Sequence, residues 1–308
     1  MPKSIRARLD KSTHPGLALD KYARSWGGSA DSKWQEKVQK AVCEQVAKLS
    51  ASCPNGLDFA ALQRRRFSGL RALTTETFSA VTTGPLTLHL ARASVLENAG
   101  ICLHPLYGFT YLPGTGLKGM ARAYAETVWK AVQADRRKAE DSILAVFGNE
   151  SGEPRAERQH VGFIVFHDAW PHEWPKLVVD IVNCHHPKYY GGSDGPGDWE
   201  NPVPVYFLAV PDGVKFSFAL SKVRSDVLDE FLGLAREWLV GALEHAGAGA
   251  KTAAGYGVFK IIAEAETDKR VSERVREVWT GALSGGTRAE FETVLELVSP
   301  AFLAGASQ

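Results

Sequence analysis

The stretch GAGAKTAAGYG, residues 247–257, joins a helix pattern to a strand pattern and so decides how the chain folds. Before it, residues 225–243 place apolar side chains at helical spacing, and after it the run 258–262 is typical of a strand. A second glycine-rich joint, PGTG at 113–116, ties the strand pattern before it to a helix pattern over 117–132. Two helices that are each tied to a strand in this way predict an α+β fold, with an antiparallel sheet and helices on one face.

Further patterns divide the chain into three parts. Residues 1–70 read as an N-terminal helical segment, 71–263 as the sheet-bearing core and 264–308 as a helical tail. Within the core, an insertion at 184–202 is rich in Gly, Pro and Asp and has no periodicity, which predicts a functional or disordered loop. A helix pattern occupies 31–50, and strand patterns occupy 76–92 (interrupted at Gly84-Pro85), 107–112, 160–170, 176–183, 202–210 and 214–221.

The composition excludes several classes of protein. With 44% hydrophobic residues and eight tryptophans, the 308-residue chain can bury a large core, so global disorder is excluded. It has no apolar run of about 18 residues and no apolar N-terminal stretch, so neither a membrane span nor a secretory signal is expected. The four cysteines form no CxxC pair, which favours a reducing, cytoplasmic location.

The net charge of +1 hides an uneven distribution of charge. Residues 1–130 carry 18 Lys and Arg against 9 Asp and Glu, whereas residues 131–308 carry 18 against 26. A basic first part favours an anionic partner such as nucleic acid, because phosphate contacts depend on one face of a protein and not on its total charge. The alternative is that these cations only solvate helix surfaces.

The glycine loop at 247–257 does not fit a nucleotide-binding loop, so no ATP or NAD cofactor is expected. A P-loop places Gly directly before its Lys and runs from a strand into a helix, but here an alanine precedes Lys251 and the order is reversed. The loop can instead hold a phosphate backbone, since glycines such as Gly249 let consecutive N–H groups approach an anion. Lys251 adds a charge, Thr252 a hydroxyl and Tyr256 a ring on which a base can stack. The alternative is a plain turn with Tyr256 packed inward.

The second joint, in YLPGTGLKGMARAYAE, predicts a phosphate site at a helix N-terminus. Thr115 can cap this helix, and the free N–H groups of its first turn, from Gly114 to Gly116, point at the joint. Lys118 and Arg122 are four residues apart, so they share a helix face, which we expect to look back at that terminus. A helix N-terminus beside two cations is typical of an anion site. The alternative is an ordinary cap with two solvated cations.

The insertion carries CHHPKYY, for which three interpretations are open. His185 or His186 could act as the general base of a metal-independent ribonuclease, with Lys188 stabilising the developing phosphorane charge. The same histidines beside two tyrosines are also typical of an RNA-stacking surface, which we favour, and the third interpretation is a plain structural loop. Adjacent histidines rarely chelate one tetrahedral ion, and neither CxxC nor HxxxH spacing occurs, so no metal site is expected. Outside the insertion, Arg71 and the arginine triplet 64–66 could follow a phosphate backbone or form a solvated face.

Several of these motifs together resemble a known family. LPGTGLKGMAR and the glycine loop are similar to motifs of the RAMP superfamily of CRISPR RNA-binding proteins. Six further motifs narrow the resemblance: HPGLALDKYARSW, HPLYGFTYLPG, FGNE, GFIVFHDAWP, DIVNCHHPKYY and DWENPVPVYFLAV. Their order, over residues 14–262, is similar to that in the sixth-subunit family of the type III-B CRISPR (Cmr) effector complex.

This resemblance implies a ferredoxin-like (RRM-like) core with insertions, in which the first helix and the final strand can lie side by side and form one groove. It implies a non-catalytic subunit near the 3′ end of the guide RNA, in defence against foreign nucleic acid. The implied partners are the guide RNA, the target RNA and other RAMP subunits of a cytoplasmic ribonucleoprotein. Two small hydroxyl residues are common in the family where Thr115-Gly116 stands here, so one side-chain contact is in doubt. A metal-independent RAMP endoribonuclease and a pure protein-interaction subunit remain the alternative functions.

Overall fold

The structure, a computed structural model, describes residues 14–20, 32–73, 75–90, 100–149, 161–193, 195–199 and 201–263. Residue contacts group Met1–Ile261 into one compact unit and Ile262–Gln308 into a second. The predicted helical tail at 264–308 lies outside the described residues, and the division of the chain at residue 70 stays a prediction.

The alternating strand patterns produce a central sheet with the order β2-β6-β1-β7, in which β3 also pairs with β6. β6 runs antiparallel to β1, β2 and β3. Phe78 lies opposite Phe218 in the β1–β6 pair, and their rings stack with centroids 5.0 Å apart, which favours this register. The strand bounds are β1 Thr75–Thr82, β2 Ile164–Phe166, β3 Trp170–Pro171, β6 Lys215–Lys222 and β7 Phe259–Ile262.

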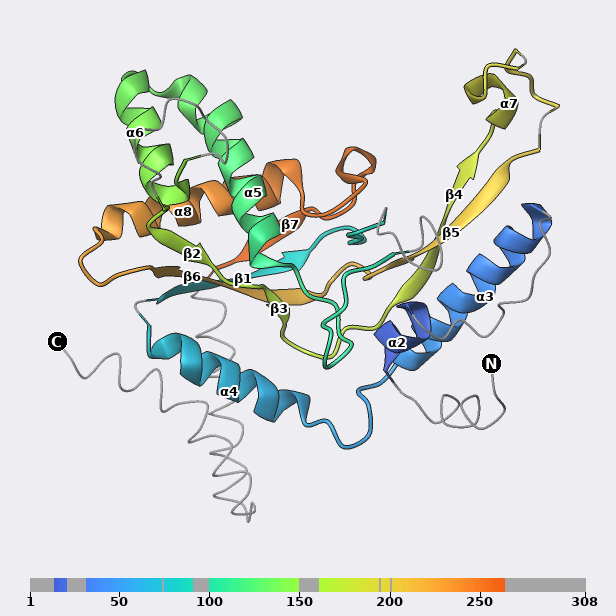
Figure 1. The fold of residues 1–308 in the computed structure, drawn as a ribbon, viewed down its shortest axis with the longest axis horizontal. Helices are drawn as coiled ribbons and strands as arrows, with labels where there is room; N and C mark the ends of the chain where they lie inside the picture. The colour runs from blue at the N-terminus through green and yellow to red at the C-terminus, as the bar shows by residue number, and fades with distance from the viewer. Residues whose placement is uncertain are drawn as a thin grey trace. The chain divides into compact units, whose positions relative to one another are not determined.

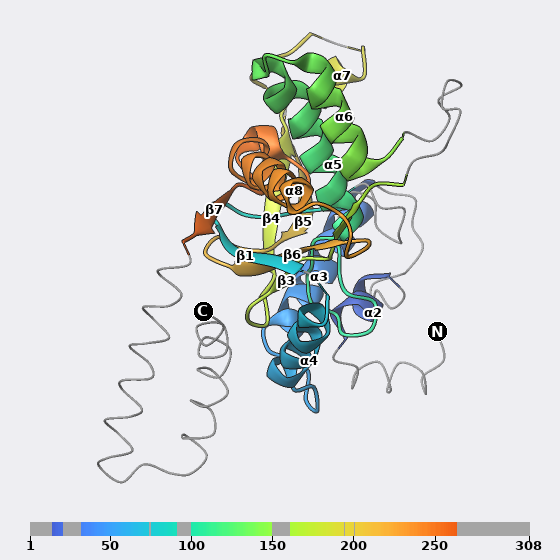
Figure 2. The same ribbon diagram turned by 90° about the vertical axis from the view of Figure 1, so that its left-hand side faces the viewer.

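Three helices, α5, α6 and α8, cover one face of this sheet (Figures 1 and 2). Their apolar stripes face inward, and Trp238 of α8 is fully buried, with its ring 4.9 Å from that of Trp129 and 5.5 Å from that of Phe147. The predicted α+β fold is confirmed, and the placement of α5 and α6 between β1 and β2, and of α8 between β6 and β7, is compatible with a ferredoxin-like core. The helix bounds are α5 Gly114–Tyr124, α6 Arg136–Phe147 and α8 Asp229–Gly241; π-helical turns at Ala125–Trp129 and Ala242–Ala246 extend α5 and α8.

Two of the predicted strands form a separate ribbon. β4 (Val178–Cys184) and β5 (Val203–Ala209) pair antiparallel with each other as a two-stranded sheet. The ribbon packs on α3 (Ser32–Ser50), the helix predicted at 31–50, which also contacts α2 (Pro15–Asp20). The four consecutive strand patterns therefore do not share one sheet. The insertion predicted at 184–202 forms the tip of the ribbon and carries the short helix α7 (Pro187–Tyr190) (Figure 1).

The predicted strand at 107–112 is wrong, because this segment forms isolated bridges and no ladder. Leu112 bridges to Ala169, and its N–H donates to the Ala169 carbonyl over 3.0 Å. Gly108 has a φ of +82° and reverses the chain, so the extended run is too short to pair along a strand.

Helix α4 (Phe59–Arg71) lies on the side of the sheet opposite α5 and α8 (Figures 1 and 2). It begins after Asp58, whose carboxylate accepts a hydrogen bond from the N–H of Ala61 (2.8 Å). Gln63 on α4 donates to the Pro171 carbonyl, which ties the helix to β3.

Candidate functional site

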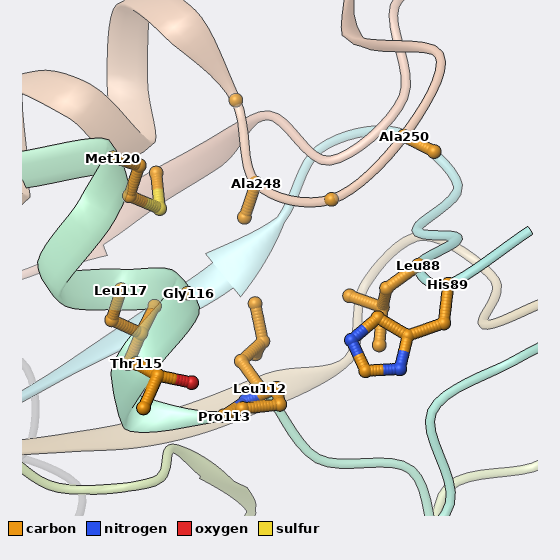
Figure 3. A pocket seen from close by; sticks show the side chains of 12 residues that line it. Leu88, His89, Leu112, Pro113, Thr115, Gly116, Leu117, Met120, Ala248 and Ala250 are labelled. Atoms are coloured by element: carbon orange, nitrogen blue, oxygen red, sulfur yellow. The ribbon is translucent and has the colours of Figure 1, made fainter. Parts of the chain in front are cut away.

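The two glycine-rich joints meet in the structure and enclose a cavity of about 370 Å³ (Figure 3). Thr115 and Gly116, in the first turn of α5, line one side, and Gly247 and Gly249 of the glycine loop line another. His89, in the chain after β1, lies at a third side. The chain therefore brings together the two motifs that the sequence analysis singled out separately.

The N-terminus of α5 has two backbone donors at this cavity. The helix begins after Pro113, so Thr115 does not cap it as expected, and no side chain of the α5 joint itself makes a cap hydrogen bond. The N–H of Gly114 instead donates to Oδ1 of Asp168, 2.7 Å away in the turn between β2 and β3. Within the described residues the N–H groups of Thr115 and Gly116 have no partner, and both residues are exposed. These two donors, at the positive end of the helix, can bind an acceptor oxygen or an anion.

The backbone of the glycine loop is held tightly against the chain after β1. The N–H of Ala250 donates to the Thr87 carbonyl and that of Ala248 to the Gly257 carbonyl, each over 2.7 Å. Gly249 has a φ of +90°, and a Cβ there would lie 2.3 Å from the Thr87 oxygen, so only glycine fits. The loop therefore uses part of the N–H groups that we expected to hold phosphate, and in exchange it forms a rigid wall of the cavity.

The side chains of the loop face the β4–β5 ribbon and not the cavity. The Lys251 ammonium lies 5.0 Å from the ring centroid of the buried Phe207 on β5. The Tyr256 hydroxyl donates to Oδ2 of Asp180 on β4 (2.5 Å). Both side chains are half-buried, as is Thr252. Two residues that we expected to contact RNA thus also anchor the loop to the ribbon.

The Tyr256–Asp180 contact predicts a dependence of stability on alkaline pH. Burial and the hydrogen bond to Asp180 raise the pKa of Tyr256 to about 12, above its ordinary value of 10.0. A raised pKa stabilises the fold below pH 10, and this contribution is lost as the pH rises through 12. We expect Tyr256→Phe to lower the free energy of unfolding at neutral pH by about 1 kcal/mol and to remove from an absorbance titration the ionisation that Tyr256 contributes near pH 12. Tyr189→Phe, at an exposed ring, should change neither; equal effects of the two variants would contradict this assignment.

Lys118 and Arg122 lie away from the cavity. At about 100° per residue, Lys118 projects from α5 about 200° from Gly116, and neither cation is among the residues that line the cavity. Arg122 pairs with Glu126 on the same helix (Nε to Oε1, 2.7 Å). Burial and the charge of Arg122 lower the pKa of Lys118. The two cations share a face as expected, and neither of them lines the cavity at the helix N-terminus.

The insertion residues lie at the tip of the ribbon, where β4 ends, and apart from the glycine loop (Figure 1). His185 and Lys188 are exposed and His186 is half-buried, with the two imidazole centroids 6.5 Å apart. Tyr190 and Trp199 are 76% and 79% exposed, so the tip offers aromatic surface to a partner. In the described part of the chain, no group of three His, Cys, Asp or Glu side chains is placed to hold a metal ion.

The arginines of α4 differ in what they contact. Arg66 donates to the Asp168 carbonyl, and its guanidinium lies 4.7 Å from the ring centroid of Trp170. Arg66 therefore holds the turn whose carboxylate caps α5. Arg71 ends α4, and its side chain lies outside the described part of the structure.

Two residues of the site, Asp168 and His89, were missed by the sequence analysis. Asp168 lies in GFIVFHDAWP, where it reads as part of a strand, and its role as a cap depends on a helix start 54 residues earlier. His89 follows the alternating run Leu86–Leu88 and also reads as a strand residue, but its φ is +58°. No local signal in the sequence indicates either role, because tertiary contacts determine both.

Comparison with known proteins shows that all residues of the site lie within the segment that matches one protein family. The model of the RAMP superfamily matches residues 26–260. The CRISPR system Cmr subunit Cmr6 of Pyrococcus furiosus is 33% identical over 126 residues, which cover 38% of this chain and 34% of that protein. The Cmr6 subunit of Saccharolobus solfataricus is 25% identical over 172 residues, which cover 54% of this chain and 50% of that protein. The matched part thus spans between a third and a half of the length of these curated relatives.

A solved structure shares the fold. A chain of the cryo-EM structure of the type III-B Cmr-β complex bound to cognate target RNA has a TM-score of 0.53, with 77% of each chain covered and 23% identity. At that identity the likeness concerns the fold alone.

None of the described helices is long and apolar enough to cross a membrane.

Proposed function

Because this chain belongs to the RAMP superfamily, we propose that it is an RNA-binding subunit of a type III-B CRISPR ribonucleoprotein in the cytoplasm. The similarity to two Cmr6 subunits supports the assignment to this type of complex. Its partners in this proposal are the guide RNA, which it holds towards the 3′ end, the target RNA and neighbouring RAMP subunits. The exposed aromatic side chains at the tip of the ribbon suit such partners.

The cavity between α5 and the glycine loop is the observation that carries this proposal. It combines two N–H groups of a helix N-terminus, unpartnered among the described residues, with a rigid loop wall that glycines allow to pack against the chain after β1. Lys251, half-buried in the same loop, adds a positive charge on the side of the loop that faces the ribbon. Backbone donors and a nearby cation are the groups with which proteins hold an RNA backbone irrespective of its sequence.

We further propose that the subunit binds RNA without cutting it. Metal-independent cleavage needs a general base together with a group that stabilises the phosphorane charge. Among the residues that line the cavity, His89 is the one titratable side chain. His185, His186 and Lys188 lie at the tip of the ribbon and are not among the described residues that line this cavity.

A salt series with a labelled single-stranded RNA of about 40 nucleotides tests the proposal. The logarithm of the binding constant should fall linearly with the logarithm of the salt concentration, with a slope of about 0.7 for each phosphate contact. The bound RNA should be recovered intact. Recovery of cut RNA would contradict the proposal and indicate a nuclease. His185→Ala and His186→Ala would then be the variants that test which histidine is needed for cleavage. Absence of binding at every salt concentration, for a chain that co-purifies with other subunits, would favour a protein-interaction subunit.

Reversal of the charge at Lys251 should weaken RNA binding. We expect Lys251→Glu to lower the affinity about tenfold at low salt and to reduce the salt slope by about 0.7. Lys251→Arg, which keeps both the charge and the contact with the Phe207 ring, should retain affinity. Lys138→Glu makes the same charge change at an exposed position on α6, apart from the loop in Figure 1, and should have little effect. Equal losses in Lys251→Glu and Lys138→Glu would assign the effect to net charge alone.

A further inference from the structure

We propose that the cavity receives the base of one unpaired RNA nucleotide, which stacks on the imidazole of His89. This inference rests on the proposed RNA binding and adds which chemical group enters the cavity. The base would lie between His89 and the side of the cavity formed by α5, with its polar edge or its phosphate at the N–H groups of Thr115 and Gly116. His89 would then be a binding residue, which the sequence motifs do not indicate.

The cavity has the size and lining that a nucleobase requires. Its volume of about 370 Å³ lies in the range of about 300 to 1,000 Å³ that is usual for small-molecule pockets. Leu112, Leu117 and Met120 supply apolar contact, and the backbone of α5 supplies donors at one end. Bases of unpaired RNA are commonly splayed out, stacked on an aromatic or histidine ring and hydrogen-bonded along their edges.

His89 is exposed and is held in a conformation that few residues other than glycine adopt. Its φ of +58° lies in the left-handed region. In Figure 3 the imidazole lies among the side chains that line the cavity, on the other side from Met120. His89 is exposed and lines the cavity, and its ring makes no hydrogen bond and no ring contact with the described residues, so the ring is available for stacking on a ligand.

The uncharged lining and its free N–H donors favour an RNA base over a charged or apolar protein side chain as the occupant. Among the described residues that line the cavity there is no Lys, Arg, Asp or Glu, so this lining suits a neutral planar group better than a charged side chain. An apolar side chain from a partner would leave the N–H groups of Thr115 and Gly116 without acceptors, which is unfavourable once they are buried. A base carbonyl or a phosphate oxygen satisfies them.

The cavity is also formed in advance of binding. The hydrogen bond from Ala250 to Thr87 and the close approach of Gly249 to the same carbonyl fix the loop wall against the chain that carries His89. On the other side, the bond from Gly114 to Asp168 fixes the start of α5. A site whose walls are fixed loses little conformational entropy when a ligand enters.

Photo-crosslinking of the full-length chain tests the inference. RNA that carries 4-thiouridine at every uridine is bound, irradiated and digested, and the crosslinked peptides are identified by mass spectrometry. We expect crosslinks in the peptides that contain His89 and Met120. His89→Gly removes the ring and suits a positive φ, so the fold should persist; we expect it to lower both the crosslink yield at Met120 and the RNA affinity about fivefold or more, as loss of one stacked base does. His89→Asn, which also tolerates this φ, should behave like His89→Gly.

The outcomes separate this inference from the proposed function. If RNA binds but the crosslinks map away from the cavity, and His89→Gly binds as wild type does, the inference is overturned while RNA binding stands. If no RNA binds, the proposed function falls and the inference falls with it. Protection of Met120 from oxidation by a co-purified protein, but not by RNA, would assign the cavity to a protein partner and overturn the inference as well.

Discussion

Gly257→Ala lowers the free energy of unfolding by about 3 kcal/mol or more, whereas Gly255→Ala, two residues earlier, lowers it by about 1 to 2 kcal/mol. Both glycines have positive φ angles, +69° and +86°, so alanine is strained at either position. At Gly255 a Cβ would meet no atom within 4 Å, and the cost is that of the backbone conformation alone. At Gly257 a Cβ would lie 1.8 Å from the carbonyl oxygen of Ala248, and backbone has to move.

The movement at Gly257 would also open the loop. The Gly257 carbonyl accepts the N–H of Ala248, and the Gly257 N–H donates to Pro85, each over 2.7 Å. Displacement of residue 257 therefore breaks the two bonds that close the loop on itself and on the chain after β1. The loss of both bonds adds to the steric cost, which is why we expect an effect well above that at Gly255.

Denaturant unfolding followed by tryptophan fluorescence measures the stability of both variants, since the buried Trp238 reports on the packing of α8 against Trp129 and Phe147. Gly255→Ala is the matched control for the effect of a positive φ. Equal destabilisation by the two variants would mean that the loop relaxes freely around residue 257 and is not a rigid wall of the cavity.

The fold was largely predictable from sequence because its elements are periodic. The apolar stripes at 117–132 and 225–243 predicted the two helices α5 and α8. The glycine-rich joints marked where α5 begins and where the helical segment that includes α8 ends. The prediction that failed was which strands pair with one another. β4 and β5 look like strands of the central sheet by composition, and only their pairing in the structure shows that they form a two-stranded ribbon of their own, which packs on α3. Strand partners are chosen by contacts distant in sequence, which periodicity does not report.

The candidate site was predictable in its backbone but not in its side chains. The sequence predicted two glycine-rich joints, at 113–116 and 247–257, and the structure brings both to one cavity. The sequence could not show that Tyr256 bonds to Asp180 on the ribbon, that Lys118 projects away from the cavity, or that His89 lines it. Each of these depends on the direction in which a side chain leaves its element once the elements have packed.

Gly114→Ala should be as damaging to α5 as Gly257→Ala is to the loop, because Gly114 lies directly against the backbone at the end of β2. A Cβ at position 114 would lie 2.0 Å from the carbonyl oxygen of Phe166 and 3.0 Å from the carbonyl carbon of His167. Both neighbours are backbone atoms of β2 and the turn after it, so they cannot swing aside as a side chain would. The start of α5 has to lift off, and the bond from Gly114 to Asp168 (2.7 Å) is lost with it. We expect a loss of about 3 to 5 kcal/mol in the free energy of unfolding.

Gly119→Ala, on the exposed side of the same helix, is the matched control and should change stability in the opposite direction. A Cβ at position 119 meets no atom within 4 Å, and alanine favours a helix interior over glycine by up to about 1 kcal/mol. Thermal and denaturant unfolding of the two variants should therefore shift in opposite directions from wild type. If the cavity is the RNA site, Gly114→Ala should also lose RNA affinity under conditions where it is still folded, since the N–H groups of Thr115 and Gly116 move with the helix start, while Gly119→Ala binds as wild type does. A Gly114→Ala variant that is as stable as wild type would show that α5 is not fixed on β2 at this point, and the rigid wall on which the site depends would be absent.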